Sequence, residues 1–188
     1  MKDIALHILD ITENSVRAKA TEIRLTQISD NNGILEFHLT DNGCGIAPDM
    51  LATITDPFTT SRTTRKVGMG LSLLRQNVDR TNGSFQIQSE LNVGTQLIFS
   101  FNTSHIDCLP VGDMAGVLSI LITSNPQVLF TYKLTTPVSE FEISTHDITE
   151  QLDGLPLGMP EVVKFVKEYI AENYAAAFPE IRILDTNK

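Results

Sequence analysis

The chain has 188 residues, of which 41% are apolar and 20% are charged. This composition is typical of a globular protein with a hydrophobic core and excludes an intrinsically disordered chain. The 23 acidic and 14 basic residues leave a net charge of −9, which argues against sequence-independent binding to nucleic acid or to an anionic membrane. We therefore expect neutral, basic or metal-bridged partners.

The sequence contains no pattern typical of a signal peptide, a membrane-spanning segment or a disulfide framework. The amphipathic pattern starts directly after Met1, and the longest apolar run is far shorter than the ~18 residues of a membrane span. Cys44 and Cys108 form no CxxC pair and are too few for a disulfide framework. We expect a cytoplasmic protein that makes no membrane contact.

The first segment begins with a helix and a hairpin. Ile4, Ile8 and Ile11 recur at helical spacing, which predicts a helix over residues 3–19. Period-two alternation then predicts strands over 22–28 and 35–39. The Asp-Asn-Asn-Gly sequence between them is typical of a tight turn.

The remainder of the first segment is predicted to contain two helices, two strands and two loops. These are a Gly-rich loop at 40–45, a helix at 48–54, a mobile loop at 56–67, a helix at 70–81 that ends at Asn82-Gly83, and strands around 85–88 and 95–102. This order predicts an α/β fold with a mixed or antiparallel sheet covered on one face by helices.

The second segment differs in charge. Residues 1–103 carry a net charge of −2, whereas residues 104–188 carry −7. The patterns predict an apolar strand at 117–123, strands at 128–135 and around Phe141, and a helix at 160–178. Because no Ser/Gly linker separates the two segments, we expect 104–188 to pack on residues 1–103 as a smaller, acidic α+β extension.

A polar stripe follows the first predicted helix. His7, Asp10, Asn14 and Arg17 are spaced so that they occupy an arc of about 80° at ~100° per residue. A solvated helix face gives the same pattern, but flanking isoleucines and leucines favour a stripe that faces a pocket. An Asn oxygen can ligate Mg²⁺, and a carboxylate one turn earlier can deprotonate a water.

Three glycine-containing turns are candidate ligand sites. Asp41-Asn42-Gly43-Cys44-Gly45 directly follows a strand, and its carboxylate can accept a hydrogen bond from an exocyclic amine such as that of adenine. Gly68-Met69-Gly70-Leu71 opens a helix after a basic loop, where free N–H groups attract phosphate. Gly94-Thr95 lies at the last hairpin. Taken singly, each is equally compatible with an ordinary turn.

Taken together and in order, these motifs resemble the GHKL family of ATP-binding domains, which includes histidine kinases, type II topoisomerases, heat-shock chaperones and MutL-type repair proteins. The resemblance covers residues 1–103 and includes an Asp-Pro-Phe-Thr-Thr stretch at 56–60. It implies a Bergerat two-layer α/β sandwich that binds Mg-ATP under a flexible lid.

The resemblance also implies roles for individual residues. Asn14 resembles the family's Mg²⁺ ligand, Arg17 its phosphate-side cation, and Asp41 the adenine-reading aspartate, with Gly43 and Gly45 as supporting glycines. Asp10 takes the place of a catalytic Glu that is one methylene longer. The remaining implied ATP-binding residues are Thr60, Gly68, Gly70, Leu71 and Thr95.

Three functions stay open at this point. The chain is either a slow ATPase or ATP-switched regulator, or a kinase that transfers the γ-phosphate to a partner, or a nucleotide-sensing module without turnover. We expect residues 104–188 to contact an unidentified protein partner. His146-Asp147 has the form of a phosphoacceptor pair, but it follows the predicted ATP unit, and we interpret it as the start of a short helix, capped by Thr145 or Asp147. Glu13 is expected to pair with Arg17 on the surface.

Overall fold

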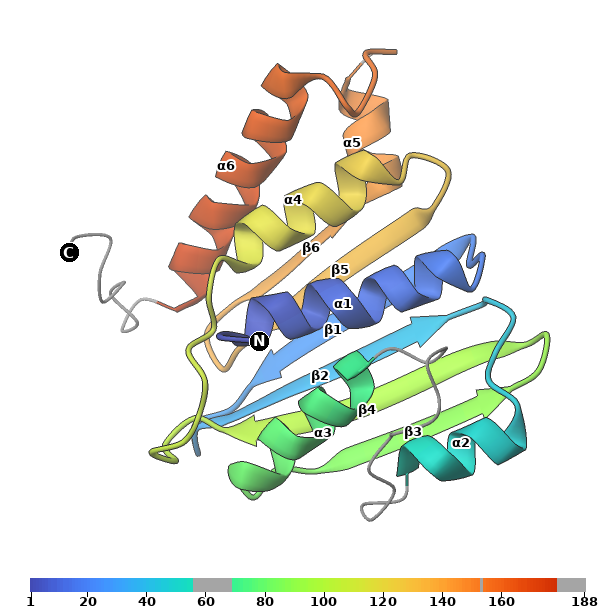
Figure 1. Cartoon of the computed structure of the whole chain (residues 1–188). Helices are drawn as coiled ribbons and strands as arrows, with labels where there is room; N and C mark the ends of the chain where they lie inside the picture. The colour runs from blue at the N-terminus through green and yellow to red at the C-terminus, as the bar shows by residue number, and fades with distance from the viewer. Residues whose placement is uncertain (56–68, 153, 179–188) are drawn as a thin grey trace.

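The computed structural model describes residues 1–55, 69–152 and 154–178. It contains one six-stranded mixed sheet in the order β3-β4-β2-β1-β5-β6. The helices α1, α3, α4 and α6 lie on one face of this sheet (Figure 1). The predicted α/β fold with helices on one face is therefore confirmed.

The first half of the chain follows the predicted order of elements. Its helices and strands are α1 (Ile4–Arg17), β1 (Glu22–Ser29), β2 (Ile34–Asp41), α2 (Pro48–Thr55), α3 (Met69–Arg80), β3 (Phe85–Glu90) and β4 (Gly94–Asn102).

Local chemistry explains the boundaries of these elements. Asp3 caps α1, because its side chain accepts a hydrogen bond from the Leu6 N–H at 2.9 Å. The Asp30 carboxylate accepts from the N–H groups of Asn32 (2.9 Å) and Ile34 (2.7 Å) and so closes the β1–β2 turn. Asn82 has φ +55°, the left-handed conformation expected just after the end of α3.

The second half adds α4 (Met114–Ser124), β5 (Leu129–Thr135), β6 (Glu140–Ser144), α5 (Thr145–Gln151) and α6 (Pro160–Ala177). Strand β5 pairs in parallel with β1, with Leu25 opposite Tyr132, and β6 pairs antiparallel with β5. The two halves therefore contribute strands to one continuous sheet.

The prediction of a strand at 117–123 is wrong. These residues belong to α4, which begins where the Asp113 side chain accepts from the Gly116 N–H at 2.8 Å. A short, continuous apolar run suits a buried strand and a buried helix equally well. The helix forms here because α4 is enclosed by α1, α6 and β5, so nearly every side of it is buried.

A buried polar network joins the halves inside the core. Gln27 of β1 accepts from the Tyr132 hydroxyl at 2.8 Å and donates to the Tyr174 hydroxyl of α6 at 2.7 Å. Burial raises the pKa of Tyr174 to about 12 and raises the pKa of Tyr132 well above its ordinary value. Both hydroxyls therefore stay protonated and can donate to Gln27 or accept from it.

The connection between the halves also touches the first helix. The N–H groups of Ile4 and Ala5 donate to the carbonyls of Pro110 (3.0 Å) and Val111 (2.9 Å). These bonds satisfy two of the free N–H groups at the start of α1. The strap at residues 103–113 is thereby fixed to the helix that carries the polar stripe.

Helix α5 begins with a capping box. The Ser144 hydroxyl accepts from the Asp147 N–H, and the Asp147 carboxylate accepts from the Ser144 N–H. Asp147 is thus a capping residue, as predicted, whereas Thr145 is already the first helical residue.

In the described parts of the chain, no helix is both long and apolar enough to span a bilayer.

Candidate functional site

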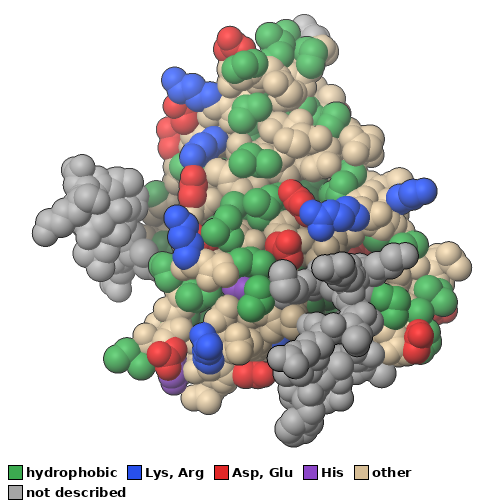
Figure 2. All heavy atoms as spheres, in the orientation of Figure 1, with side chains coloured by type: hydrophobic (Ala, Val, Ile, Leu, Met, Phe, Trp, Pro, Cys, Tyr) green, Lys and Arg blue, Asp and Glu red, His purple; other side chains and the backbone are tan. Residues whose placement is uncertain are grey.

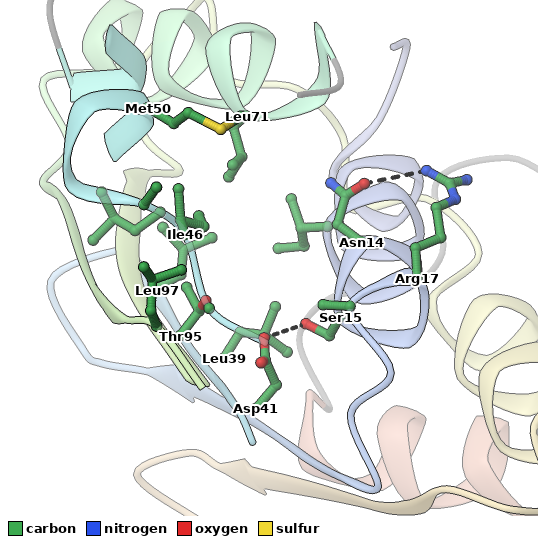
Figure 3. A pocket seen from close by; sticks show the side chains of 16 residues that line it. Asn14, Ser15, Arg17, Leu39, Asp41, Ile46, Met50, Leu71, Thr95 and Leu97 are labelled. Atoms are coloured by element: carbon green, nitrogen blue, oxygen red, sulfur yellow. Dashed lines mark hydrogen bonds between the residues drawn. The ribbon is translucent and has the colours of Figure 1, made fainter. Parts of the chain in front are cut away.

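A cavity of about 540 Å³ lies between α1 and the adjoining ends of β2 and β4. Apolar side chains make up most of its wall, and polar groups lie at its two ends (Figure 3). The lining residues include Ile11, Asn14, Ser15, Arg17, Leu39, Asp41, Gly45, Ile46, Met50, Leu71, Ile87, Thr95 and Leu97.

Asp41 is held rigidly at one end of the cavity. It is the last residue of β2, and each of its carboxylate oxygens accepts one hydrogen bond, from the Ser15 hydroxyl (2.6 Å) and from the Gly43 N–H (2.9 Å). Thr95 lies opposite Asp41 in the β2–β4 register. Each carboxylate oxygen retains capacity for a further donor from the cavity.

The loop after Asp41 needs its glycines. Gly45 has φ +67°, and a Cβ there would overlap the carbonyl of Glu90. A Cβ at Gly43 would lie 2.9 Å from the Ala18 carbonyl oxygen. The Cys44 N–H donates to that same carbonyl oxygen at 2.9 Å, which fastens the loop to the end of α1.

A serine on β3 supports the same loop from the other side. The Ser89 hydroxyl accepts from the Ile46 N–H at 2.8 Å and lies 2.9 Å from the Thr95 hydroxyl. It also donates to the Gly94 carbonyl at 2.9 Å. Ser89 thus positions both Thr95 and the backbone that closes the cavity.

Asn14 and Arg17 lie at the other end of the cavity. The Arg17 guanidinium donates to the Asn14 side-chain oxygen at 3.1 Å and to Glu13 at 2.6 Å, with Arg17 63% exposed. The predicted Glu13–Arg17 surface pair is confirmed. The exposed guanidinium at the cavity mouth suits an anionic ligand group, and the Asn14 oxygen suits a cation bound beside it.

Asp10 lies one turn before Asn14 and under the first turn of α3. A Cβ on Gly70 would overlap the Asp10 carboxylate, so only glycine allows this approach. The Asp10 Oδ2 atom is buried and has no hydrogen-bond partner in the described part of the chain. A buried carboxylate oxygen without a partner is costly and marks a position of interest.

His7 is an internal residue of the α1–α3 contact. It is fully buried, and its Nε2 lies 2.9 Å from Asn77 Nδ2, which can only donate. Burial lowers the pKa of His7, so the ring is neutral with its proton on Nδ1. His7 therefore packs α1 against α3 and does not enter the cavity.

The cavity brings together most of the predicted residues. Those that line it are Asn14, Arg17, Asp41, Gly45, Leu71 and Thr95. Gly43 supports Asp41 through its N–H, and Asp10 and Gly70 contact each other beside the cavity. Thr60, Gly68, the stretch at 56–60 and the predicted mobile loop lie outside the described residues.

Two residues of the site are missing from the sequence-based set. Ser15 interrupts the buried row Ile4, Ile8, Ile11, and Ser89 falls on the inward-facing register of β3 after Ile87. A hydroxyl at an apolar position of a regular pattern is the available signal in both cases. It shows that a polar partner is needed but does not say which one.

The oxygen donors at the cavity suit a metal ion whose other ligands come mostly from a bound phosphate and from water. The described residues hold no cluster of three His, Cys, Asp or Glu side chains. Asn14 supplies one hard oxygen at the cavity mouth, which fits a Mg²⁺ ion bound largely by phosphate oxygens and water. It does not fit a metal site built from protein side chains alone.

Sequence comparisons agree on the family. The family model described as histidine kinase-, DNA gyrase B-, and HSP90-like ATPase matches residues 2–105. A putative sensor protein of Shewanella frigidimarina is 33% identical over 105 residues, which cover 53% of this chain and 16% of that protein. The autoinducer 2 sensor kinase/phosphatase LuxQ of Vibrio harveyi is 34% identical over 107 residues, covering 53% and 12% respectively. This chain thus spans less than a fifth of either relative.

A solved structure extends the likeness beyond the family-model range. The MutL ATPase domain of Aquifex aeolicus, complexed with ADP, matches with a TM-score of 0.51 and 13% identity, over 81% of this chain and 68% of that one. That coverage exceeds what residues 2–105 can supply, so part of the second half shares its fold as well. Motif order, fold and family-model match agree, and the chain belongs to the histidine kinase-, DNA gyrase B- and HSP90-like ATPases.

Proposed function

We propose that this protein binds Mg-ATP in the cavity between α1 and the β2–β4 end of the sheet. The observation that carries the proposal is the fixed Asp41 carboxylate at one end of an apolar cavity whose other end holds Asn14 and Arg17. The family match, and the ADP with which the MutL ATPase domain is complexed, support the same ligand class.

The wall chemistry suits a nucleoside triphosphate. The flat, apolar adenine ring would lie among Leu39, Ile87 and Leu97, and its exocyclic amine would donate to Asp41. The triphosphate would extend toward Asn14 and Arg17 and toward the first turn of α3, where free N–H groups and the helix dipole favour negative charge. Mg²⁺, when bound, would neutralise phosphate charge.

Three roles are assigned to the chain's own residues beside the phosphates. Asn14 would contribute an oxygen to the metal once Arg17 turns from it toward phosphate. Asp10 would accept a proton from the attacking water, because its buried oxygen has no other partner in the described chain. Gly70 would keep Asp10 and the start of α3 in contact. Slow hydrolysis, used as a switch read by residues 104–188 or by a partner, is the activity proposed.

Transfer of the γ-phosphate to a partner protein is the second candidate. Its support is the similarity of 53% of this chain to an autoinducer 2 sensor kinase/phosphatase. In this reaction a partner side chain would replace water as the nucleophile. Nucleotide sensing without turnover is the remaining alternative, favoured by the short Asp10 side chain.

Calorimetry tests binding. Mg²⁺ with a non-hydrolysable ATP analogue should bind saturably, and Asp41→Asn should abolish that binding. Asp107→Asn, an exposed substitution outside the cavity, should bind as the wild type does. An absence of adenine-nucleotide binding by the wild type would refute the proposal.

Labelled ATP separates the three activities. Free labelled phosphate from the purified protein supports hydrolysis, and label found only on an added partner supports transfer. An intact γ-phosphate after long incubation in both settings supports sensing alone. If hydrolysis holds, Asp10→Asn should keep the affinity for the analogue and lose turnover.

A further inference from the structure

The outermost strand β6 leaves one edge of the sheet open. The Thr136 N–H donates to the Ser139 carbonyl at 2.8 Å, which makes Thr136 and Ser139 a hydrogen-bonded pair. Hydrogen-bonded pairs alternate along an antiparallel ladder, so the next ones are Leu134–Phe141 and Tyr132–Ile143. Phe141 and Ile143 therefore direct their backbone groups toward β5. Those of Glu140 and Glu142 point away from the sheet, and in the described chain no further strand pairs with β6.

Acidic side chains mark the same open positions. Glu140 and Glu142 are both exposed on the sheet face opposite the helices. Glu140 lies 3.6 Å from Lys133, whereas Glu142 forms no ion pair with any described residue. The open backbone groups of β6 thus lie next to negative charge.

An exposed aromatic pair lies on the helical side of this edge. Phe165 and Tyr169 of α6 are 50% and 43% exposed and stack with ring centroids 6.2 Å apart. Tyr169 also meets Phe141 of β6 edge to face, at 5.8 Å. The pair is therefore continuous with the inner side of the strand edge.

Negative charge surrounds the aromatic pair. Glu161, Glu168 and Glu172 share with Phe165 and Tyr169 an arc of about 100° on α6. Only Glu168 is paired among the described residues, with Lys164 at 3.7 Å. Basic and acidic side chains lie side by side along α6 (Figure 2), where Lys164 pairs with Glu168 and Lys167 pairs with Asp113 at 2.7 Å.

These features select a basic partner over a second copy of the chain. A second β6 placed edge to edge would bring Glu140 and Glu142 close to their own counterparts, and opposed like charges destabilise strand pairing. An Arg- or Lys-bearing strand would instead meet carboxylates on one face. On its opposite face the strand would meet the rings of Phe165 and Tyr169, which attract cations.

We propose that the β6 edge and the α6 aromatic pair together dock a basic, extended segment of a partner protein as an added strand. Backbone bonds to Glu140 and Glu142 would supply the pairing, and alternate side chains would reach the carboxylates and the rings. The proposal deepens the partner-binding part of the proposed function and rests on that part, independently of nucleotide binding.

A fluorescent ten-residue peptide of alternating Arg and Val tests this on the nucleotide-free 188-residue chain. Fluorescence anisotropy should show saturable binding with a dissociation constant on the order of 10 µM that weakens with salt. Glu142→Lys and Tyr169→Ala should each weaken binding roughly tenfold. Glu150→Lys, an equal charge change outside the edge, should leave it unchanged.

Two N-methylated peptides distinguish strand addition from simple charge attraction. Methylation of every second N–H in one register should abolish binding, and methylation in the other register should leave most of it. Equal binding by both peptides, no binding by the parent peptide, or no effect of Glu142→Lys would overturn the proposal. So would a dimer, detected by light scattering, that Tyr169→Ala dissociates.

Discussion

The two halves of the molecule use the same sheet in different ways. In the second half, α4 and α6 fill the space above β5 and β6 with side chains such as Leu118, Val166 and Ile170, each fully buried. In the first half, α1 and α3 leave about 540 Å³ above β2 and β4. The fold supplies a layered core in both halves, and the candidate site is the place where that core is left unfilled.

The comparison also separates two kinds of buried polar group. Between the halves, Gln27 of β1 and the hydroxyls of Tyr132 and Tyr174 satisfy one another. In the first half, an oxygen of Asp10 is left without a partner in the described chain. A satisfied network stabilises a fold, whereas an unsatisfied carboxylate costs stability and is retained where chemistry needs it.

Removal of residues 104–188 should have the largest effect. It would expose one side of β1, delete the partners of Gln27, and free the first turn of α1. We expect a loss of more than about 5 kcal/mol, comparable with the whole stability of a small domain. Thermal unfolding followed by circular dichroism would check this. A cooperative transition from the fragment 1–103 would instead show two separable domains.

Gly70→Ala should have the next largest effect. The added methyl group would push against the Asp10 carboxylate and displace the first turn of α3, at a cost of about 2 kcal/mol. Nucleotide affinity should fall in parallel. Gly158→Ala is the matched control, because its Cβ would meet nothing within 4 Å. Equal urea midpoints for the two variants would contradict the close approach.

Alkaline pH should act on the second half. The folded protein binds the Tyr174 proton more tightly than the unfolded chain, since the pKa rises from 10 to about 12. This contribution is fully present below pH 10 and is lost between about pH 10 and 12. It is on the order of 2–3 kcal/mol. Tyr174→Phe should lower stability at pH 8 but flatten this alkaline decline, as measured by urea unfolding at pH 8 and pH 11.

Ser15→Ala should have the smallest effect, and only in the first half. It removes one hydrogen bond to Asp41 without disturbing the β2–β4 pairing. We expect a loss of about 1 kcal/mol in nucleotide binding, or roughly fivefold in affinity, by calorimetry. The unfolding midpoint should hardly change. An unchanged affinity would mean that the Gly43 N–H alone orients Asp41.

The success of sequence reasoning differs between the halves for physical reasons. In residues 1–103, alternating strands and turn chemistry fix the elements locally, and the order of motifs locates Asp41, Asn14 and Thr95 at one cavity. In the second half, α4 is apolar on almost every side, so the spacing of its apolar residues could not distinguish a helix from a strand. The parallel pairing of β5 with β1 and the hydroxyl partners Ser15 and Ser89 depend on tertiary contacts that no local pattern encodes.

The strap at residues 103–113 makes α1 a mechanical element common to both halves. Its first turn is bonded to Pro110 and Val111, and its later turns carry Asp10 and Asn14. A helix of 14 residues is stiff, so a tilt imposed at one end arrives at the other. A movement of the second half that shifts the strap would therefore displace Asp10 and Asn14. A ligand that holds those two residues in place would in turn restrict the motion of the strap.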